Sequence, residues 1–307
     1  MTAIPYLRRV RVTVAERARP LSPLDRLTLL YAAFSTAVLM AHVVGWRHEP
    51  LPIRGAAPVF IANGLLMLAV AAAPWARCSR SRRFLAEWYV AIVLVGLYAT
   101  VGTLNAPAAG GGGSYDALVQ RWDQALFGFQ PAWVWPRAMP SRWFAEFLSA
   151  CYLSFYAVVI SVPATLWATG RHPEARKAIF AILLTFFSCY AIFLLFPVVG
   201  PYGDWPWPVG RAWTGPATRA VHHVLETGDS WGSAFPSSHV AASVVALVCA
   251  FRSWRPLGWI LLTPVIGILL AVVYLQAHYG VDALAGLAMA GFASWIAPRL
   301  CREDCLA

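Results

Sequence analysis

Hydrophobic residues in this chain occur in long runs, separated by shorter stretches rich in arginine, proline and glycine. Most runs reach roughly 18 to 20 residues, the length that an α-helix needs to cross about 30 Å of hydrocarbon. We therefore expect an all-α fold, a polytopic membrane helix bundle of about eight transmembrane helices. The expected spans are residues 27–46, 57–76, 87–104, 143–168, 178–199, 237–252, 257–275 and 281–298.

Two longer segments between the runs have other patterns. After the glycine-rich stretch 106–114, which predicts a flexible loop, the sequence YDALVQRWDQALFGF has one apolar face at helical spacing. This segment is too short and too polar to span a bilayer, so we expect an interfacial helix at the outer face. Residues 200–236 contain too many prolines, glycines and tryptophans for a span, and their length is typical of a functional loop or lid.

Composition supports a membrane protein and argues against nucleic-acid binding. Hydrophobic residues make up 59% of the 307 positions and charged residues only 12%, about half the charged share of a soluble domain. The net charge of +10 arises mainly from arginines in the segments that cytoplasmic termini would place inside the cell, as the positive-inside rule requires. We expect a multi-pass protein of the cell membrane with no nucleic-acid partner.

The chain contains no visible repeat or second domain. We expect residues 1–26 to form a basic cytoplasmic segment and residues 27–104 to form accessory transmembrane helices. Residues 105–300 would form the membrane catalytic core, and residues 301–307 a cytoplasmic tail. The first segment has no apolar core followed by a cleavage site, so a secretory signal peptide is not expected.

Two histidines and an aspartate are the strongest candidates for chemistry. Two membrane crossings and a turn need roughly 40 residues, so the hairpin between His239 and His278 returns both histidines to one side of the membrane. Asp282 follows His278 by one helical turn, where its carboxylate can face the imidazole. A carboxylate bonded to one ring nitrogen fixes the tautomer and leaves the other nitrogen as base or nucleophile. Ionisable residues at membrane depth indicate a functional site.

The sequence FPSSH, which ends at His239, adds a candidate anion site. Ser237 and Ser238 would contribute hydroxyls beside the free backbone N–H groups of a helix N-terminus, which bind phosphate. The set indicates phosphoryl transfer through a phosphohistidine. His278 would attack phosphorus, Asp282 would orient it, and His239 would protonate the leaving oxygen. This chemistry requires neither a metal nor a cofactor.

Other ionisable residues have simpler interpretations. A histidine at the end of a span is usually an interfacial residue, and we interpret His42 and His172 as structural. His222 and His223 are interpreted mainly as loop residues. For Glu146, near the outer end of the fourth span, the pattern leaves two alternatives: an acid that faces the bundle interior, or a charge at a helix start.

The motifs FPSSH and YLQAHYGVDALAG resemble the second and third signature motifs of the type 2 phosphatidic acid phosphatase superfamily, PSxH and SRxxxxxHxxxD. The resemblance covers roughly the last 130 residues well. It implies a metal-independent membrane enzyme with His278 as nucleophile, Asp282 as its partner, His239 as acid and Ser237 as phosphate ligand.

The sequence departs from this superfamily at its cationic residues. The first motif, KxxxxxxRP, is absent, and Ala271 and Val272 replace the SR pair of the third. A phosphodiester carries one negative charge and needs such a clamp less than a dianionic monoester does. The pattern with FPVVGPYG is similar to the inositol phosphorylceramide synthase branch, which suggests Tyr202 as a further substrate contact. Arg211 and Arg219, the cations of the 200–236 segment, are candidates to replace the clamp.

These observations favour a phosphotransferase with its site at the outer membrane face. It would move a phospho-head-group from a phospholipid donor to a lipid or alcohol acceptor. A lipid phosphatase of the same fold, in which water replaces the acceptor, is the first alternative. A transporter whose histidines and aspartate relay protons is the second, but the paired halves of many transporters are not visible in this chain.

Overall fold

The computed structural model describes residues 21–45, 53–77, 83–110 and 113–301. Most of the expected basic segment 1–26 and of the tail 301–307 lies outside the described residues. Within the described ranges the chain is helical, as expected. The elements are α2 (Pro23–Val43), α3 (Ile53–Arg77), α4 (Arg83–Gly110), α5 (Asp116–Phe127), α6 (Pro131–Ala138), α7 (Arg142–Leu153), α8 (Phe155–Ala168), α9 (His172–Leu195), α10 (Pro201–Asp204), the 3-10 helix η2 (Arg211–Trp213), α11 (Pro216–Gly228), α12 (Ser238–Ser253), α13 (Arg255–Tyr274) and α14 (Gly280–Leu300).

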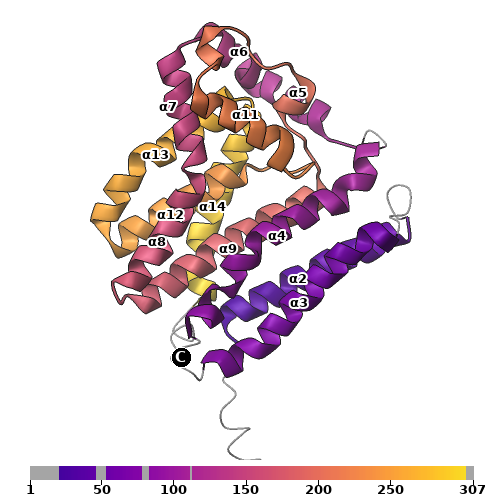
Figure 1. The fold of residues 1–307 in the computed structure, drawn as a ribbon, viewed down its shortest axis with the longest axis vertical. Coiled ribbons are helices and arrows are strands. Elements are labelled where there is room, and N and C mark those ends of the chain that lie inside the picture. The colour runs from indigo at the N-terminus through magenta and orange to yellow at the C-terminus, as the bar shows by residue number, and fades with distance from the viewer. Residues whose placement is uncertain (1–20, 46–52, 78–82, 111–112, 302–307) are drawn as a thin grey trace, which may run out of the picture.

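Helix α12 is central to the part of the bundle that carries the two histidines. It packs against α8, α9, α13 and α14, and α13 packs against α7. Helices α2, α3 and α4 lie on the other side of α9, which α2 and α4 contact (Figure 1). This layer corresponds to the segment 27–104, which we expected to be accessory to the site.

Small residues allow α12 and α14 to pack closely. A Cβ atom on Gly286 would lie 2.6 Å from the carbonyl oxygen of Ser237, so a larger residue there would push the helices apart. Ala241 and Ala242 of α12 and Ala290 of α14 are buried, and such small side chains are typical of close helix contacts in membranes. The packing fixes the relative positions of the two helix N-termini that carry His239 and Asp282.

Three helices differ from the expected spans. Helix α4 continues to Gly110, so residues 106–110 of the stretch expected to be a flexible loop are helical. The segment 143–168 is not one helix but the pair α7 and α8, with a bend of 43° between them at Ser154. The sequence at this position contains no proline or glycine that would predict a break. Helix α9 ends at Leu195, before the expected end at residue 199. Pro197 accounts for this end because a proline disfavours helical backbone in the residue before it and cannot donate an N–H group.

Four of the described helices are long and apolar enough to cross a membrane: α2, α9, α13 and α14. The bent pair α7 and α8 makes five if it counts as one span. Residues Ala56–Ala72 of α3 and helix α12 are apolar but shorter. The chain is therefore an all-helical protein with several membrane-span candidates, and the expected count of about eight is not confirmed.

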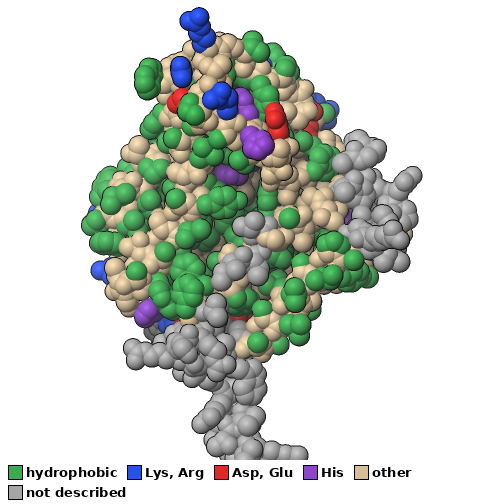
Figure 2. All heavy atoms as spheres, viewed as in Figure 1, with side chains coloured by type: hydrophobic (Ala, Val, Ile, Leu, Met, Phe, Trp, Pro, Cys, Tyr) green, Lys and Arg blue, Asp and Glu red, His purple; other side chains and the backbone are tan. Residues whose placement is uncertain are grey.

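The two long segments between the apolar runs come together at one end of the bundle. The segment 115–127 forms α5, as expected, and α5, α6 and α11 lie at this end (Figure 1). In the view of Figure 2, charged side chains gather at this end, whereas the sides of the bundle below it carry mainly hydrophobic and uncharged groups. This distribution suits a bundle with its sides in lipid and this end in water.

Candidate active site

His278 lies in the turn between α13 and α14, which has an uncommon backbone. Gln276 has a φ of 57°, a left-handed conformation that few residues other than glycine adopt. The turn brings Nδ1 of His278 to 2.8 Å from the carbonyl oxygen of Ala234. Because a carbonyl oxygen can only accept, Nδ1 carries the proton and Nε2 of the neutral ring keeps its lone pair. The tautomer therefore suits attack by Nε2.

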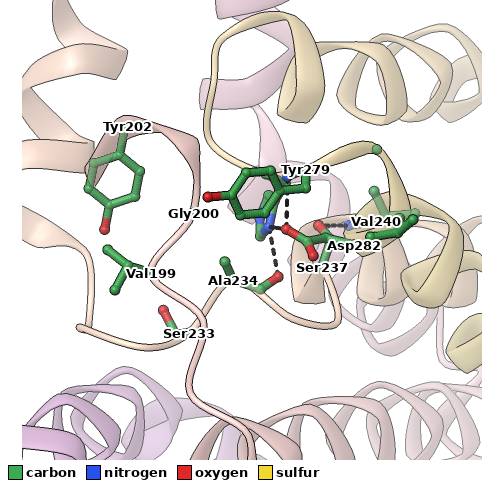
Figure 3. Close-up of polar contacts among 12 residues, drawn as sticks. Val199, Gly200, Tyr202, Ser233, Ala234, Ser237, Val240, Tyr279 and Asp282 are labelled. Atoms are coloured by element: carbon green, nitrogen blue, oxygen red, sulfur yellow. Dashed lines mark hydrogen bonds and ion pairs between the residues drawn. The ribbon is translucent and has the colours of Figure 1, made fainter. Parts of the chain in front are cut away.

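Asp282 lies close to His278 but does not form the hydrogen bond that the sequence predicted. Its Oδ2 atom is 3.7 Å from Nδ1 of His278, beyond hydrogen-bonding distance. The same oxygen accepts the backbone N–H of Tyr279 at 2.8 Å, so Asp282 caps the N-terminus of α14 (Figure 3). The Ala234 carbonyl fixes the tautomer instead, and Asp282, fully buried, contributes negative charge beside the imidazole.

His239 lies in the first turn of α12, with its ring packed on two aromatic residues. The centroid of its imidazole is 4.8 Å from that of Tyr152 and 4.2 Å from that of Phe155. The imidazole centroids of His239 and His278 are 5.8 Å apart. The hairpin of α12 and α13 thus brings the two rings together, as their spacing predicted. A phosphoryl group between the rings could be reached from both sides.

The two serines of FPSSH form the start of α12. Ser237 is the N-cap residue: its Oγ accepts the N–H of Val240, and its own N–H donates to the backbone carbonyl of Asp282 at 3.0 Å. Ser238 is the first residue of the helix, and both serines are buried. The first turn of a helix leaves backbone N–H groups without intrahelical acceptors, so this end of α12 can receive an anion.

A strand-like segment before α10 supports the loop that holds His278. Val198 and Ser233 form an isolated bridge, and the N–H of Tyr202 donates to the carbonyl of Gln276 at 3.0 Å. Gly200 has a φ of 102°, and a Cβ there would lie 2.8 Å from the carbonyl oxygen of Ala277. Glycine is thus required on two grounds, the left-handed backbone and the close approach.

Two aspartates of α5 hold the segments on either side of the site, and sequence reasoning missed this role. Asp116 accepts the N–H groups of Val199 at 2.9 Å and Gly200 at 2.8 Å. Asp123 accepts those of Gly280 at 3.0 Å and Val281 at 2.8 Å. Both aspartates are buried. The available signal was their spacing of seven residues, which puts two acids on one face of a helix.

Asp229 is a second group that the sequence did not reveal. It accepts the hydroxyl of Tyr202 at 2.9 Å and also those of Tyr98 and Ser233. Burial is the main reason that the pKa of Tyr202 is raised, and the charge of Asp229 raises it further. Tyr202, expected to contact substrate, therefore has its hydroxyl engaged by Asp229. Ser233 precedes Ala234, so this network adjoins the segment that holds His278.

The segment 200–236 is folded and anchored to α7 by Glu146. The Glu146 carboxylate accepts the N–H groups of Ala217 and Thr218 and the Thr218 hydroxyl, at 3.1, 2.9 and 2.7 Å. It therefore caps the N-terminus of α11, a role outside the two alternatives left by the sequence. Arg211 and Arg219 are exposed, and within the described ranges no hydrogen bond or ion pair holds either guanidinium. Their contact with a phosphate stays a prediction.

His222, one of the two histidines of this segment, stacks on a tryptophan ring. The imidazole of His222 lies 3.9 Å from the ring of Trp207, centroid to centroid, and the indole N–H donates to Glu226. Burial lowers the pKa of His222 below its ordinary value of 6.5, whereas His223 is exposed. Over the part of the chain that is described, no three His, Cys, Asp or Glu side chains are arranged to hold a metal ion.

An all-helical bundle that pairs two histidines beside a buried carboxylate has the arrangement of a membrane phosphoryl-transfer enzyme. The family model described as the PAP2 superfamily matches residues 117–296, more than half of the chain. The chain belongs to this superfamily, and membership supports a phosphatase or phosphotransferase enzyme.

A PA-phosphatase related-family protein of Dictyostelium discoideum is also similar to the chain. The two are 24% identical over 222 residues, which cover 57% of this chain and 38% of that protein. The similarity thus spans about two fifths of the relative's length. No solved structure is significantly similar to the chain.

Proposed function

We propose that the chain is a membrane phosphotransferase that moves a phospho-head-group from a phospholipid to a lipid alcohol through a phosphohistidine. One observation carries this proposal. The Ala234 carbonyl holds the proton of His278 on Nδ1, which leaves Nε2 free to attack, and the ring centroid of His239 is 5.8 Å from that of His278. Superfamily membership supports the reaction class.

The reaction has two balanced steps. Nε2 of His278 attacks the donor phosphorus, and the P–O bond to the lipid alcohol breaks. The leaving oxygen takes a proton from His239. The acceptor hydroxyl then attacks the same phosphorus, the P–N bond breaks, and the hydroxyl proton returns to His239. Backbone N–H groups and the hydroxyls of Ser237 and Ser238 would bind the phosphate oxygens, and Tyr202 would line the substrate side.

The electrostatics favour a diester over a monoester substrate. Over the described residues, no lysine or arginine is hydrogen-bonded or ion-paired to His239, His278 or Asp282, and Asp229 adds negative charge nearby. A dianionic monoester would meet little compensation, whereas a diester has one charge, which Arg211 or Arg219 could bind from the 200–236 segment. No metal or cofactor is part of this mechanism.

The proposal includes a topology of about eight spans in the cell membrane, with cytoplasmic termini and the site at the outer face. It rests on the basic residues of the inner turns and on the shared end of α5, α6 and α11. A tag after residue 307 should be accessible only after the membrane is opened, and a tag between residues 110 and 113 should be cleaved in intact spheroplasts. Protection of the second tag would contradict the proposed face.

Reconstituted protein decides between transfer and hydrolysis. Vesicles would contain phosphatidylinositol labelled in its head group together with ceramide, or phosphatidic acid alone, and His278→Ala would be the control. We expect label to move to the second lipid and little inorganic phosphate to leave phosphatidic acid. Rapid phosphate release without a transfer product would identify a lipid phosphatase instead, and equal activity of His278→Ala would exclude the phosphohistidine.

A further inference from the structure

A shallow apolar groove of about 450 Å³, open to the outside over most of its extent, lies between α5 and the first turns of α14. It is lined by Trp122, Ala125, Leu126, Phe235, Val281 and Ala285. All six side chains are apolar, and the groove is open to the outside of the bundle. Since α14 is a membrane-span candidate and α5 lies at its N-terminal end, the groove opens at the level where lipid chains meet their head groups.

Two residues that line the groove are chain neighbours of residues in the candidate active site. Phe235 directly follows Ala234, whose carbonyl binds His278, and Val281 directly precedes Asp282. One wall of the groove is therefore the same backbone that positions the reacting groups. A molecule seated in the groove would lie against the segments that hold His278 and Asp282 in place.

The groove is preformed. Asp123, on α5, accepts the N–H groups of Gly280 and Val281, which locks α5 to the first turn of α14. The Phe235 ring packs against those of Trp122 and Phe196, at centroid distances of 5.8 and 5.4 Å. These contacts define both walls before any ligand binds, so they can orient an occupant rather than merely accommodate it.

We propose that the groove holds one acyl chain of the lipid whose phosphate reacts at His278. Each wall is one helical turn long, from Trp122 to Leu126 on α5 and from Val281 to Ala285 on α14. A turn rises about 5.4 Å, so the walls offer a partner helix only one turn of contact, whereas a flexible hydrocarbon chain can fill so short a groove with a few of its methylene groups. Because a bilayer already solvates such chains, moving one into the groove adds little hydrophobic free energy. The groove would therefore act by orienting the donor lipid, so that its head group lies toward the histidines.

This inference rests on the proposed function. Donors with long and with short acyl chains test the inference and the proposed function separately. Two variants fill the groove from opposite walls: Ala285→Trp on α14 and Ala125→Trp on α5. Ala71→Trp is the matched control, because Ala71 is an exposed alanine of α3, and α3 packs on α2 and α4 rather than on the catalytic helices. Each protein is assayed with the same phosphodiester donor carrying either two 16-carbon or two 6-carbon chains.

We expect both groove variants to lower kcat/KM for the long-chain donor by about 10- to 100-fold, the loss that a misplaced reacting group causes. Turnover of the short-chain donor should stay within about twofold of wild type, which also shows that the variants are folded. Ala71→Trp should match wild type with both donors. Equal effects of a groove variant on both donors, or no effect on either, would overturn the groove assignment. An inactive wild type would contradict the proposed function instead.

Discussion

The hydrogen bonds of Asp123 predict that a residue outside the histidine motifs controls both stability and turnover. Its carboxylate is fully buried and binds two backbone N–H groups at the start of α14. A hydrogen bond to a charged group contributes about 1.5–3 kcal/mol. Asp123→Ala removes two such hydrogen bonds and should lower the free energy of unfolding by about 3–6 kcal/mol. Asp123→Asn keeps one acceptor and should cost about half as much.

Turnover should fall as well, because the freed turn carries Asp282 and follows His278. A displacement of about 1 Å at reacting groups can cost about 100-fold in rate. The assay is the thermal unfolding midpoint in detergent, together with kcat measured well below that midpoint. Arg121→Ala, on the exposed side of α5, is the control and should change neither quantity. Wild-type stability and turnover in Asp123→Ala would refute the clamp role of α5.

The same residue gives a pH dependence with a defined sign. Burial raises the pKa of Asp123 above its ordinary value of 3.8, and the two backbone N–H groups only partly offset this. The folded protein therefore binds the proton more tightly than the unfolded chain. Stability should fall as the pH rises from 3.8 through the folded-state pKa and then level off. Asp123→Asn should lose this dependence in unfolding measurements.

Three further predictions concern the candidate active site and the segment 200–236. His278→Ala should abolish turnover, whereas Asp282→Asn should keep part of it, reduced about 10- to 1000-fold, because the Ala234 carbonyl still fixes the tautomer; complete inactivity of a folded Asp282→Asn would contradict this division. Arg211→Ala or Arg219→Ala should lower the transfer rate by about 10- to 1000-fold with an unchanged unfolding midpoint, and full activity of both would remove the arginines from the proposal. Because the pKa of His222 is lowered from 6.5, stability should decrease as the pH falls below 6.5; His222→Phe should reduce this loss and the exposed His223→Phe should not, as unfolding midpoints at pH 5.5 and 7.5 would test.

The sequence predicted those parts of the structure that depend on length and local pattern. Apolar runs corresponded to helices, and the spacing of His239 and His278 was enough to bring their rings together, because a hairpin of two crossings has little freedom in length. The interfacial pattern at 115–127 also corresponded to a helix. The end of α9 could have been predicted from Pro197.

The parts that could not be predicted depend on tertiary partners. The seven-residue spacing of Asp116 and Asp123 puts both on one face of α5, but it does not show that this face is buried or that Asp123 binds the start of α14. The Ala234 carbonyl is a backbone group, so no residue type marks it as the partner of His278. The i,i+4 spacing of His278 and Asp282 did bring the carboxylate within 3.7 Å of Nδ1, ion-pair distance, but it could not predict that the shorter bond of Asp282 goes to the N–H of Tyr279. The break at Ser154 likewise carries no proline or glycine signal.

The central claim, a covalent intermediate on His278, is tested most directly by isotope exchange without an acceptor. Reconstituted protein would be mixed with an unlabelled phosphodiester donor and labelled diacylglycerol, the alcohol that leaves in the first step. A phosphohistidine lets that step run in both directions, so label should enter the donor lipid with wild type and not with His278→Ala. Acceptor-dependent transfer without any exchange, or exchange that persists in His278→Ala, would contradict the account.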